Sequence, residues 1–336
     1  MSMFLRLIML GVSLSIVLSA CANGPLTEPV QATETSSTSL PAVTAVEPEA
    51  TLPSPTDVPS ATSEGAPEPT ATTAPPLTPI WEQRAPLLES NSELSVAELD
   101  GKIYALGGYP ASRQTVDTVQ IYDSATDTWR IGPPLPAASN HNVAVAAEGR
   151  VYLIGGQPTA QGGGPFLQDV FAYDPASDSW SDRSPLPLPR SGMAGAALDG
   201  KIYVAGGRPP MGHEFAVYDP QTDQWTRLPE MPTARNHFVV AALNGEIYAL
   251  GGRFGAGFSS EVTDIVEIFD PETGEWRPGT PMPTKRSGHN GIVANGCLHI
   301  MGGEGNGAGN VKGLYPQHEV YNPQTDTWTS LDPMPV

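Results

Sequence analysis

Apolar residues along this chain fall in short paired runs that are separated by turn residues and end in glycine pairs. In residues 225–252, an apolar run over 238–243 is followed by Asn244-Gly245 and by a second run that ends at Gly251-Gly252. Two apolar runs around Asn-Gly are a strong hairpin signal, because a type I′ turn needs positive φ at both central residues. The pattern predicts two adjacent antiparallel strands.

The same unit recurs five times. Each glycine pair follows a tryptophan by 26 residues, and the pairs begin at Gly107, Gly155, Gly206, Gly251 and Gly302. Each pair is followed by an aromatic residue and, seven residues later, by a tryptophan: Tyr122 and Trp129, Tyr173 and Trp180, Tyr218 and Trp225, Phe269 and Trp276, Tyr321 and Trp328. A period near 50 residues indicates a repeat architecture in which each unit packs on its neighbours.

This pattern of apolar run, glycine pair, tyrosine and tryptophan resembles the kelch repeat, and the resemblance covers residues 81–336. It implies an all-β propeller of four-stranded antiparallel blades, with the first strand innermost and the fourth outermost. In architecture the chain is similar to sialic acid mutarotase and to the central domain of galactose oxidase. Small side chains in the first apolar run of each repeat suit inner strands that crowd around an axis.

One predicted strand, at Trp81, does not belong to any of the five complete repeats. Five complete repeats are preceded by Trp81, which reads as an orphan outer strand, and the pattern ends shortly after Trp328. We expect either a truncated six-bladed ring or a five-bladed ring with an extra strand. Either arrangement leaves strand edges that favour self-association.

The first eighty residues predict an exported, anchored chain. Residues 1–20 read as a signal peptide whose apolar core is too short to span a bilayer, and Leu18-Ser19-Ala20-Cys21 resembles a bacterial lipobox. That resemblance implies lipidation of Cys21 and a membrane anchor, at the cell surface or in the periplasm; an ordinary signal peptide is the alternative. Residues 21–79 are rich in Thr, Pro, Ser and Glu, which predicts a disordered tether. The propeller is assigned to 80–336.

Charge and cysteine usage exclude some partners and cofactors. The net charge is −19, which disfavours nucleic acid. Cys21 and Cys297 stand in such different contexts that we expect no disulfide between them, and no Cys/His spacing indicates zinc. We therefore expect no metal and no cofactor.

The candidate site lies where variable loops meet. Loops between the second and third strands vary most in length, and the family architecture places them on the same face as the connections between blades. Candidate ligand-binding residues near these loops are Arg190, Arg235, Arg286, Arg208, Arg253, Asn140, His141, Asn236 and His237. A ring of arginines suits a carboxylate or sulfate ligand. The alternative is that arginine belongs to the repeat consensus and caps hydrogen bonds within the fold.

Two functions fit these features. The first is a surface-tethered module that binds a protein or a glycan at the loop face, with no catalytic role. The second is an enzyme similar to sialic acid mutarotase, with Glu304 and His289 as candidate acid and base. Copper chemistry of the galactose oxidase type is rejected, because Cys297, the spare thiol, lies in the wrong part of a blade.

Overall fold

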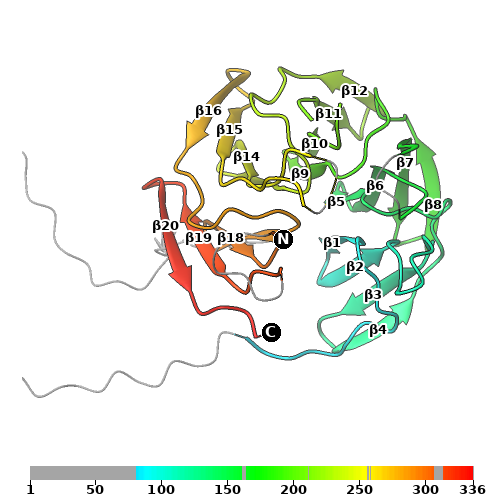
Figure 1. The fold of residues 1–336 in the computed structure, drawn as a ribbon. Helices are drawn as coiled ribbons and strands as arrows, with labels where there is room; N and C mark the ends of the chain where they lie inside the picture. Colours follow the sequence, from blue (N-terminus) through cyan, green and yellow to red (C-terminus); the bar gives the residue numbers. More distant parts are fainter. Residues whose placement is uncertain are drawn as a thin grey trace, which may run out of the picture. The chain divides into compact units, whose positions relative to one another are not determined.

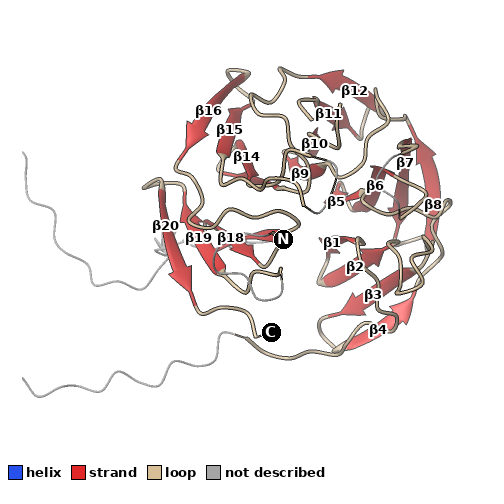
Figure 2. Cartoon of the chain, viewed as in Figure 1, coloured by secondary structure: helices blue, strands red, loops and turns tan. Residues whose placement is uncertain are grey.

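The computed structural model describes residues 81–335 apart from 161–163, 211, 256, 258 and 306–312. The described residues form a ring of five blades, each a four-stranded antiparallel sheet in sequence order from the channel outwards (Figure 1). Strands and loops make up the described chain, which has no helix and hence none that could cross a bilayer (Figure 2). The predicted all-β propeller is confirmed. The predicted signal peptide, Cys21 and the tether lie outside the described residues.

The blades follow one another along the chain. The first contains β1 (Ser95–Leu99), β2 (Lys102–Leu106), β3 (Val119–Asp123) and β4 (Thr128–Ile131). The second contains β5 (Val143–Ala147), β6 (Arg150–Gly156), β7 (Leu167–Asp174) and β8 (Ser179–Arg183). The third contains β9 (Ala194–Leu198), β10 (Lys201–Ala205), β11 (Phe215–Asp219) and β12 (Gln224–Arg227). The fourth contains β13 (Val239–Leu243), β14 (Glu246–Leu250), β15 (Val266–Asp270) and β16 (Glu275–Gly279), and the fifth β17 (Asn290–Ala294), β18 (Cys297–Met301), β19 (His318–Asn322) and β20 (Thr327–Leu331).

The hydrophobic core lies between blades rather than at the centre of the ring. Four clusters of buried side chains each join two successive blades; Tyr104 and Ile121 of the first blade, for example, pack with Leu153 of the second. The glycine pair lets backbones meet here: a Cβ on Gly107, whose φ is +64°, would lie 2.3 Å from the carbonyl oxygen of Ser139. This close approach explains why the pair recurs in every repeat.

Each joint between blades is also fastened at the rim by the recurring tryptophan. The indole Nε1 of Trp225 donates to the carbonyl of Ser184 at 2.9 Å. The amide of Ser184 in turn donates to Asp223, which also accepts from the Tyr218 hydroxyl. The other indoles donate in the same way, Trp129 to Ala85, Trp180 to Pro133, Trp276 to Pro229 and Trp328 to Thr280. We call this the rim contact; its acceptor always lies four residues past the tryptophan of the preceding repeat.

The joint between the fifth and first blades differs from the other four. The rim contact is present, since Trp81 Nε1 donates to the carbonyl of Asp332 at 3.2 Å, again four residues past a tryptophan. The stretch around Trp81 pairs with no strand among the described residues, and Val96 and Ile292, on the inner strands β1 and β17, are 52% and 54% exposed. Trp81 thus takes the place of an outer strand, and no inner strands accompany it in the described chain. We call this the open joint.

One cysteine departs from the expectation. Cys297 is fully buried at the start of β18, and its sulfur is disulfide-bonded. The prediction that the two cysteines stay apart is therefore not supported at Cys297. Cys21 lies outside the described residues.

Candidate functional site at the channel mouth

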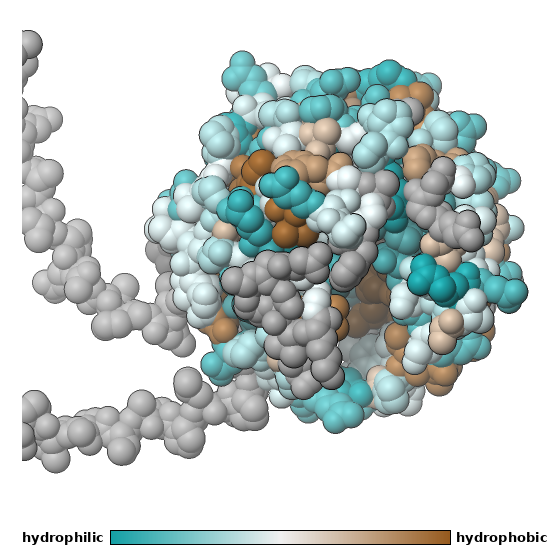
Figure 3. All heavy atoms as spheres, in the orientation of Figure 1, coloured by the Kyte–Doolittle hydropathy of each residue, from teal (hydrophilic) through white to brown (hydrophobic). Residues whose placement is uncertain are grey.

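The inner strands surround a cavity of about 570 Å³ on the axis of the ring. Its wall is made of small or apolar residues of the inner strands, among them Val96, Ala144, Gly195, Val240 and Gly291. Figure 3 shows hydrophobic residues in a recess near the centre of the ring. Isolated bridges such as Asn236 to Arg253 join the connections between blades to the loops after the second strands, so both sets of loops lie at one end of this cavity. The expected loop face is therefore present.

Five residues that stand twelve positions after successive tryptophans encircle this end of the cavity. They are Glu93, His141, Gly192, His237 and Gly288, and we call them the inner ring. Each adopts a left-handed backbone, with φ between 50° and 65°. Backbone hydrogen bonds pass from one to the next: His141 N–H donates to Glu93, Gly192 to His141, His237 to Gly192 and Gly288 to His237. Within the described residues no such bond links Gly288 back to Glu93, so the inner ring is interrupted at the open joint.

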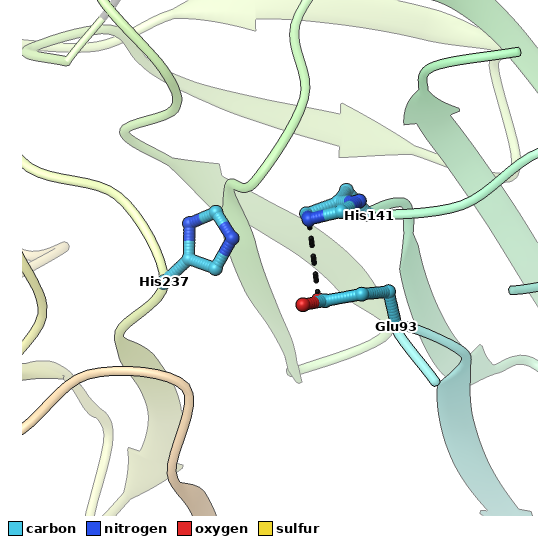
Figure 4. Close-up of side chains that lie close together, drawn as sticks. All are labelled: Glu93, His141 and His237. Carbon is cyan, nitrogen blue, oxygen red and sulfur yellow. Dashed lines mark ion pairs between the residues drawn. The ribbon is translucent and has the colours of Figure 1, made fainter. Parts of the chain in front are cut away.

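The three inner-ring residues that carry side chains point toward one another (Figure 4). Their ligand atoms all lie within 4.8 Å of each other. His141 Nε2 is 3.2 Å from Glu93 Oε2, and the imidazole rings of His141 and His237 meet edge to face at 5.0 Å between centroids. Three side chains from three separate repeats therefore form one cluster.

An asparagine precedes each histidine and holds its ring. His141 Nδ1 lies 2.5 Å from Asn140 Oδ1, and His237 Nδ1 lies 2.6 Å from Asn236 Oδ1. Where the inner ring has glycine, at Gly192 and Gly288, the preceding residue is serine instead. At the two inner-ring histidines, the preceding asparagine therefore orients the imidazole.

Charged side chains surround the cluster. Arg253 Nη1 lies 2.5 Å from Glu304 Oε1, and Arg208 Nη2 lies 3.4 Å from His237 Nε2. Burial, together with the charges of the two arginines, lowers the pKa of His141 to about 3, and burial brings the pKa of His237 well below its usual value. Burial and then the negative charge of Glu304 raise the pKa of Glu93. Both imidazoles are consequently neutral at physiological pH.

The three arginines that stand ten residues after a tryptophan lie elsewhere. Arg190, Arg235 and Arg286 are at most 2% exposed. Arg190 donates to the carbonyls of Gly206 and Glu214. Arg235 and Arg286 donate to carbonyls of their own blades and form ion pairs with Glu267 and Glu319 at 2.9 and 2.7 Å. Their Nη donors are used inside the blades, as the alternative interpretation of these arginines expects.

The remaining candidates divide between the site and its support. His141, His237 and Glu304 line the cavity, and Arg208, Arg253, Asn140 and Asn236 contact those residues from behind. His289 also borders the cavity, but its Nε2 donates to the carbonyl of Leu250 and burial lowers its pKa to about 3. Such an imidazole is poorly suited to proton transfer at neutral pH.

Sequence reasoning missed Glu93. It precedes the first complete repeat, where no histidine marks the position, although its distance of twelve residues from Trp81 equals that of His141 from Trp129. Counting from the tryptophans would have aligned Glu93 with both histidines.

Known proteins share both the sequence pattern and the fold. The chain matches the KLHDC2/KLHL20/DRC7 Kelch-repeats domain over residues 78–252 and again over 183–335. Human Kelch-like protein 23 is 29% identical over 266 residues, which are 77% of this chain and 45% of that protein. Beta-scruin of Limulus polyphemus is 28% identical over 76% of this chain and 23% of its own length. The chain thus spans less than half the length of these relatives.

Among solved structures, that of YjhT superposes with a TM-score of 0.61 and covers 72% of this chain and 84% of its own. Its sequence identity is 16%, so the similarity concerns the fold alone.

Proposed function

Because the chain belongs to the Kelch-repeat family, whose propellers generally mediate protein interactions, we propose that it is a binding module. In this proposal the propeller binds a protein or a glycan at the channel mouth, where the loops between blades meet the loops after the second strands. The fold alone does not determine function, so the proposal rests on the residues at the channel mouth.

One observation supports the channel mouth as the binding site. Charged side chains gather at one end of the cavity, where Glu93 and Glu304 face it and Arg253 sits behind them. The rest of the wall mixes small and apolar residues with polar ones such as Ser95 and Asn142. Convergent polar groups in a concave site are typical of ligand binding. The polar groups orient the ligand, and the wall supplies the buried area.

A binding screen with matched variants tests this proposal. Ligands selected on the wild-type protein from glycan and peptide arrays should lose affinity for Glu304→Ala. They should bind Glu148→Ala unchanged, because Glu148 is an exposed residue in the turn between β5 and β6, away from the inner ring. Equal binding to both variants would place recognition elsewhere on the molecule.

A second candidate function is that of a sugar-acid mutarotase or epimerase acting on substrates of the sialic acid type. The raised pKa of Glu93 and its proximity to a second carboxylate, Glu304, favour it, since general acid–base catalysis needs a carboxyl group that can carry a proton near neutral pH. Anomer exchange of sugar acids, followed by NMR, should fall in Glu93→Gln and Glu304→Gln. No enhancement by the wild-type protein over the uncatalysed rate would exclude this function.

The location of the protein is also part of the proposal. We infer an extracytoplasmic lipoprotein, at the cell surface or in the periplasm, that is anchored through a lipid on Cys21. The lipobox-like Leu18-Ser19-Ala20-Cys21 supports this assignment. Two or three acyl chains anchor a protein stably, since each buried methylene contributes about 0.8 kcal/mol.

The intact mass of the native protein tests the anchor. We expect a mass that exceeds that of the unmodified chain beginning at Cys21 by the mass of its acyl chains, and Cys21→Ser should release the protein from membranes. The chain has two cysteines, so an intramolecular disulfide at Cys297 would use the sulfur of Cys21 and compete with the lipid. A mass without acyl chains would therefore contradict the anchor.

A further inference from the structure

Three groups that can donate an electron pair meet at the inner ring: the Glu93 carboxylate and the Nε2 atoms of His141 and His237. His141 Nε2 faces Glu93 Oε2, and His237 Nε2 belongs to the same cluster. A neutral imidazole carries a hydrogen on one nitrogen only. If that hydrogen is on Nδ1 in both histidines, the two Nε2 atoms and the Glu93 carboxylate can together bind a cation; Arg208 Nη2 makes a long contact of 3.4 Å with His237 Nε2.

The hydrogen-bond network behind the cluster fixes this tautomer. The amide nitrogen of Asn236 donates to the carbonyls of Arg253 and Gly255, so its Oδ1 faces His237 and must accept from Nδ1–H. Asn140 has the same arrangement at His141, with its amide nitrogen 2.7 Å from the Thr115 hydroxyl and its Oδ1 beside His141 Nδ1. A hydroxyl can donate or accept, so the His141 tautomer is assigned by its likeness to His237. In both rings Nε2 then carries no hydrogen and can accept one or bind a cation. Metal-bound histidines are typically held by such a partner on the other ring nitrogen.

We propose that Glu93, His141 and His237 bind a divalent first-row transition metal ion, for which zinc is the probe. Two imidazoles and one carboxylate are ligands that such ions accept, and zinc sites with three protein ligands leave a position for water or another ligand. That position faces the cavity, which all three residues line. The ligand atoms, up to 4.8 Å apart, draw together on binding, because a tetrahedral site needs roughly 3.3 Å between ligands.

All three residues of the cluster have left-handed backbone. Glu93, His141 and His237 have φ of 54°, 52° and 53°, a region in which a residue other than glycine costs on the order of 1–2 kcal/mol. The chain uses glycine at the two other inner-ring positions. The same conformation occurs at turn residues such as Glu148, so what distinguishes the cluster is that its three side chains meet. The chain therefore has side chains at three positions where glycine would adopt the backbone conformation at lower cost.

The surrounding charges tolerate a cation. Arg113, Arg208 and Arg253 oppose one, and Glu93 and Glu304 offset part of their charge. Arg208 lies 3.4 Å from His237 Nε2, a long contact that the metal would replace.

Metal titration of the untagged full-length protein tests the proposal without any other ligand. We expect one equivalent of Co²⁺ to give visible d–d absorption and one equivalent of Zn²⁺ to displace it, with the Zn²⁺ affinity measured by calorimetry. His141→Gly, His237→Gly and Glu93→Gln should each abolish the Co²⁺ spectrum. The two glycine variants reproduce a residue that the chain itself uses at equivalent positions, so they preserve the fold. Asn236→Ala, which removes a support rather than a ligand, should lower Zn²⁺ affinity roughly 10–100-fold.

The other histidine pair provides the matched control. His299 Nδ1 lies 2.9 Å from His318 Nε2 in the fifth blade, so His299→Asn removes an imidazole from a pair outside the inner ring. It should leave the Co²⁺ spectrum and the stoichiometry unchanged. The proposal is overturned if the wild-type protein shows no one-to-one Co²⁺ absorption, if the inner-ring variants, folded by circular dichroism, retain it, or if His299→Asn removes it. The first result would mean that a proton on Glu93 occupies the cluster instead.

Discussion

At the residue scale, the inner ring alternates between side chains that meet and glycines that make room for them. A Cβ on Gly192 would lie 2.8 Å from Cε1 of His237, so the glycine and the histidine of neighbouring repeats depend on each other. Left-handed backbone makes the substitution harder still, since Gly192 has a φ of +65°. Space and conformation both select glycine at this position.

Replacing Gly192 by alanine tests this dependence. Backbone strain alone should destabilise Gly192→Ala by about 1–2 kcal/mol, and the clash with the His237 ring should add to that loss. Gly245→Ala is the control, because Gly245 has a φ of +82° and nothing within 4 Å of its Cβ position. Urea unfolding of both variants should show the larger loss at Gly192. An equal loss of unfolding free energy in the two variants would mean that the His237 ring moves aside without an energetic cost.

At the element scale, the rim contact joins strands of successive blades through a carboxylate. Asp326 accepts from the Tyr321 hydroxyl at 2.5 Å and from the amide of Thr280 at 2.9 Å. Where the acceptor position is Pro229, which has no amide hydrogen, the facing blade has Gly274 in place of the aspartate and Phe269 in place of the tyrosine. At the other proline acceptor, Pro133, the facing blade keeps both residues, and Asp178 accepts from the Tyr173 hydroxyl. The tyrosine–aspartate pair therefore does not depend on a backbone amide at the acceptor position.

These carboxylates predict how stability depends on pH. The Tyr321 hydroxyl and then the Thr280 amide lower the pKa of Asp326, and the Tyr122 hydroxyl and the Ala85 amide lower that of Asp127. A carboxylate with a lowered folded-state pKa stabilises the protein above its unfolded pKa, about 3.9, and that stability is lost as the pH falls below it. Asp326→Asn should therefore reduce the loss of melting temperature between pH 5 and pH 3 relative to the wild-type protein. An unchanged acid profile would show that Asp326 titrates normally.

Much of the fold and part of the site follow from the sequence. The hairpin pattern and the spacing of tryptophans predict the blades, because each repeat buries its apolar face against the next. The interior role of Arg190, Arg235 and Arg286 could not be chosen from spacing, since a guanidinium can serve a ligand or backbone carbonyls equally well. The metal-ligand set was also missed. Glu93, His141 and His237 come from three repeats, and the curvature of the ring rather than local spacing brings them together.

At the scale of the whole molecule, the open joint exposes apolar surface that the other joints bury. Val96 and Ile292, on the inner strands β1 and β17, are about half exposed, whereas the corresponding blade faces elsewhere pack into the clusters between blades. Exposed apolar residues on flanking sheets favour association with another chain.

Self-association through this surface is the prediction at this scale. Sedimentation velocity of the wild-type protein should show a concentration-dependent dimer, and Ile292→Lys should shift it to monomer. Ile131→Lys is the control: Ile131 is 53% exposed, like Ile292, but lies on the outer strand β4 of the first blade. A dimer that survives Ile292→Lys, or an absence of dimer in the wild-type protein, would contradict this role of the joint.

The interruption of the inner ring has a mechanical consequence. An unbroken circle of backbone bonds resists widening, whereas a split ring widens by small rotations shared among its remaining joints. The central channel can therefore widen and narrow, and a ligand or ion that holds Glu93 to His141 and His237 would reduce that motion. Amide hydrogen exchange should show this: Gly288, next to the split, should exchange faster than Gly192, whose neighbours on both sides are bonded into the ring.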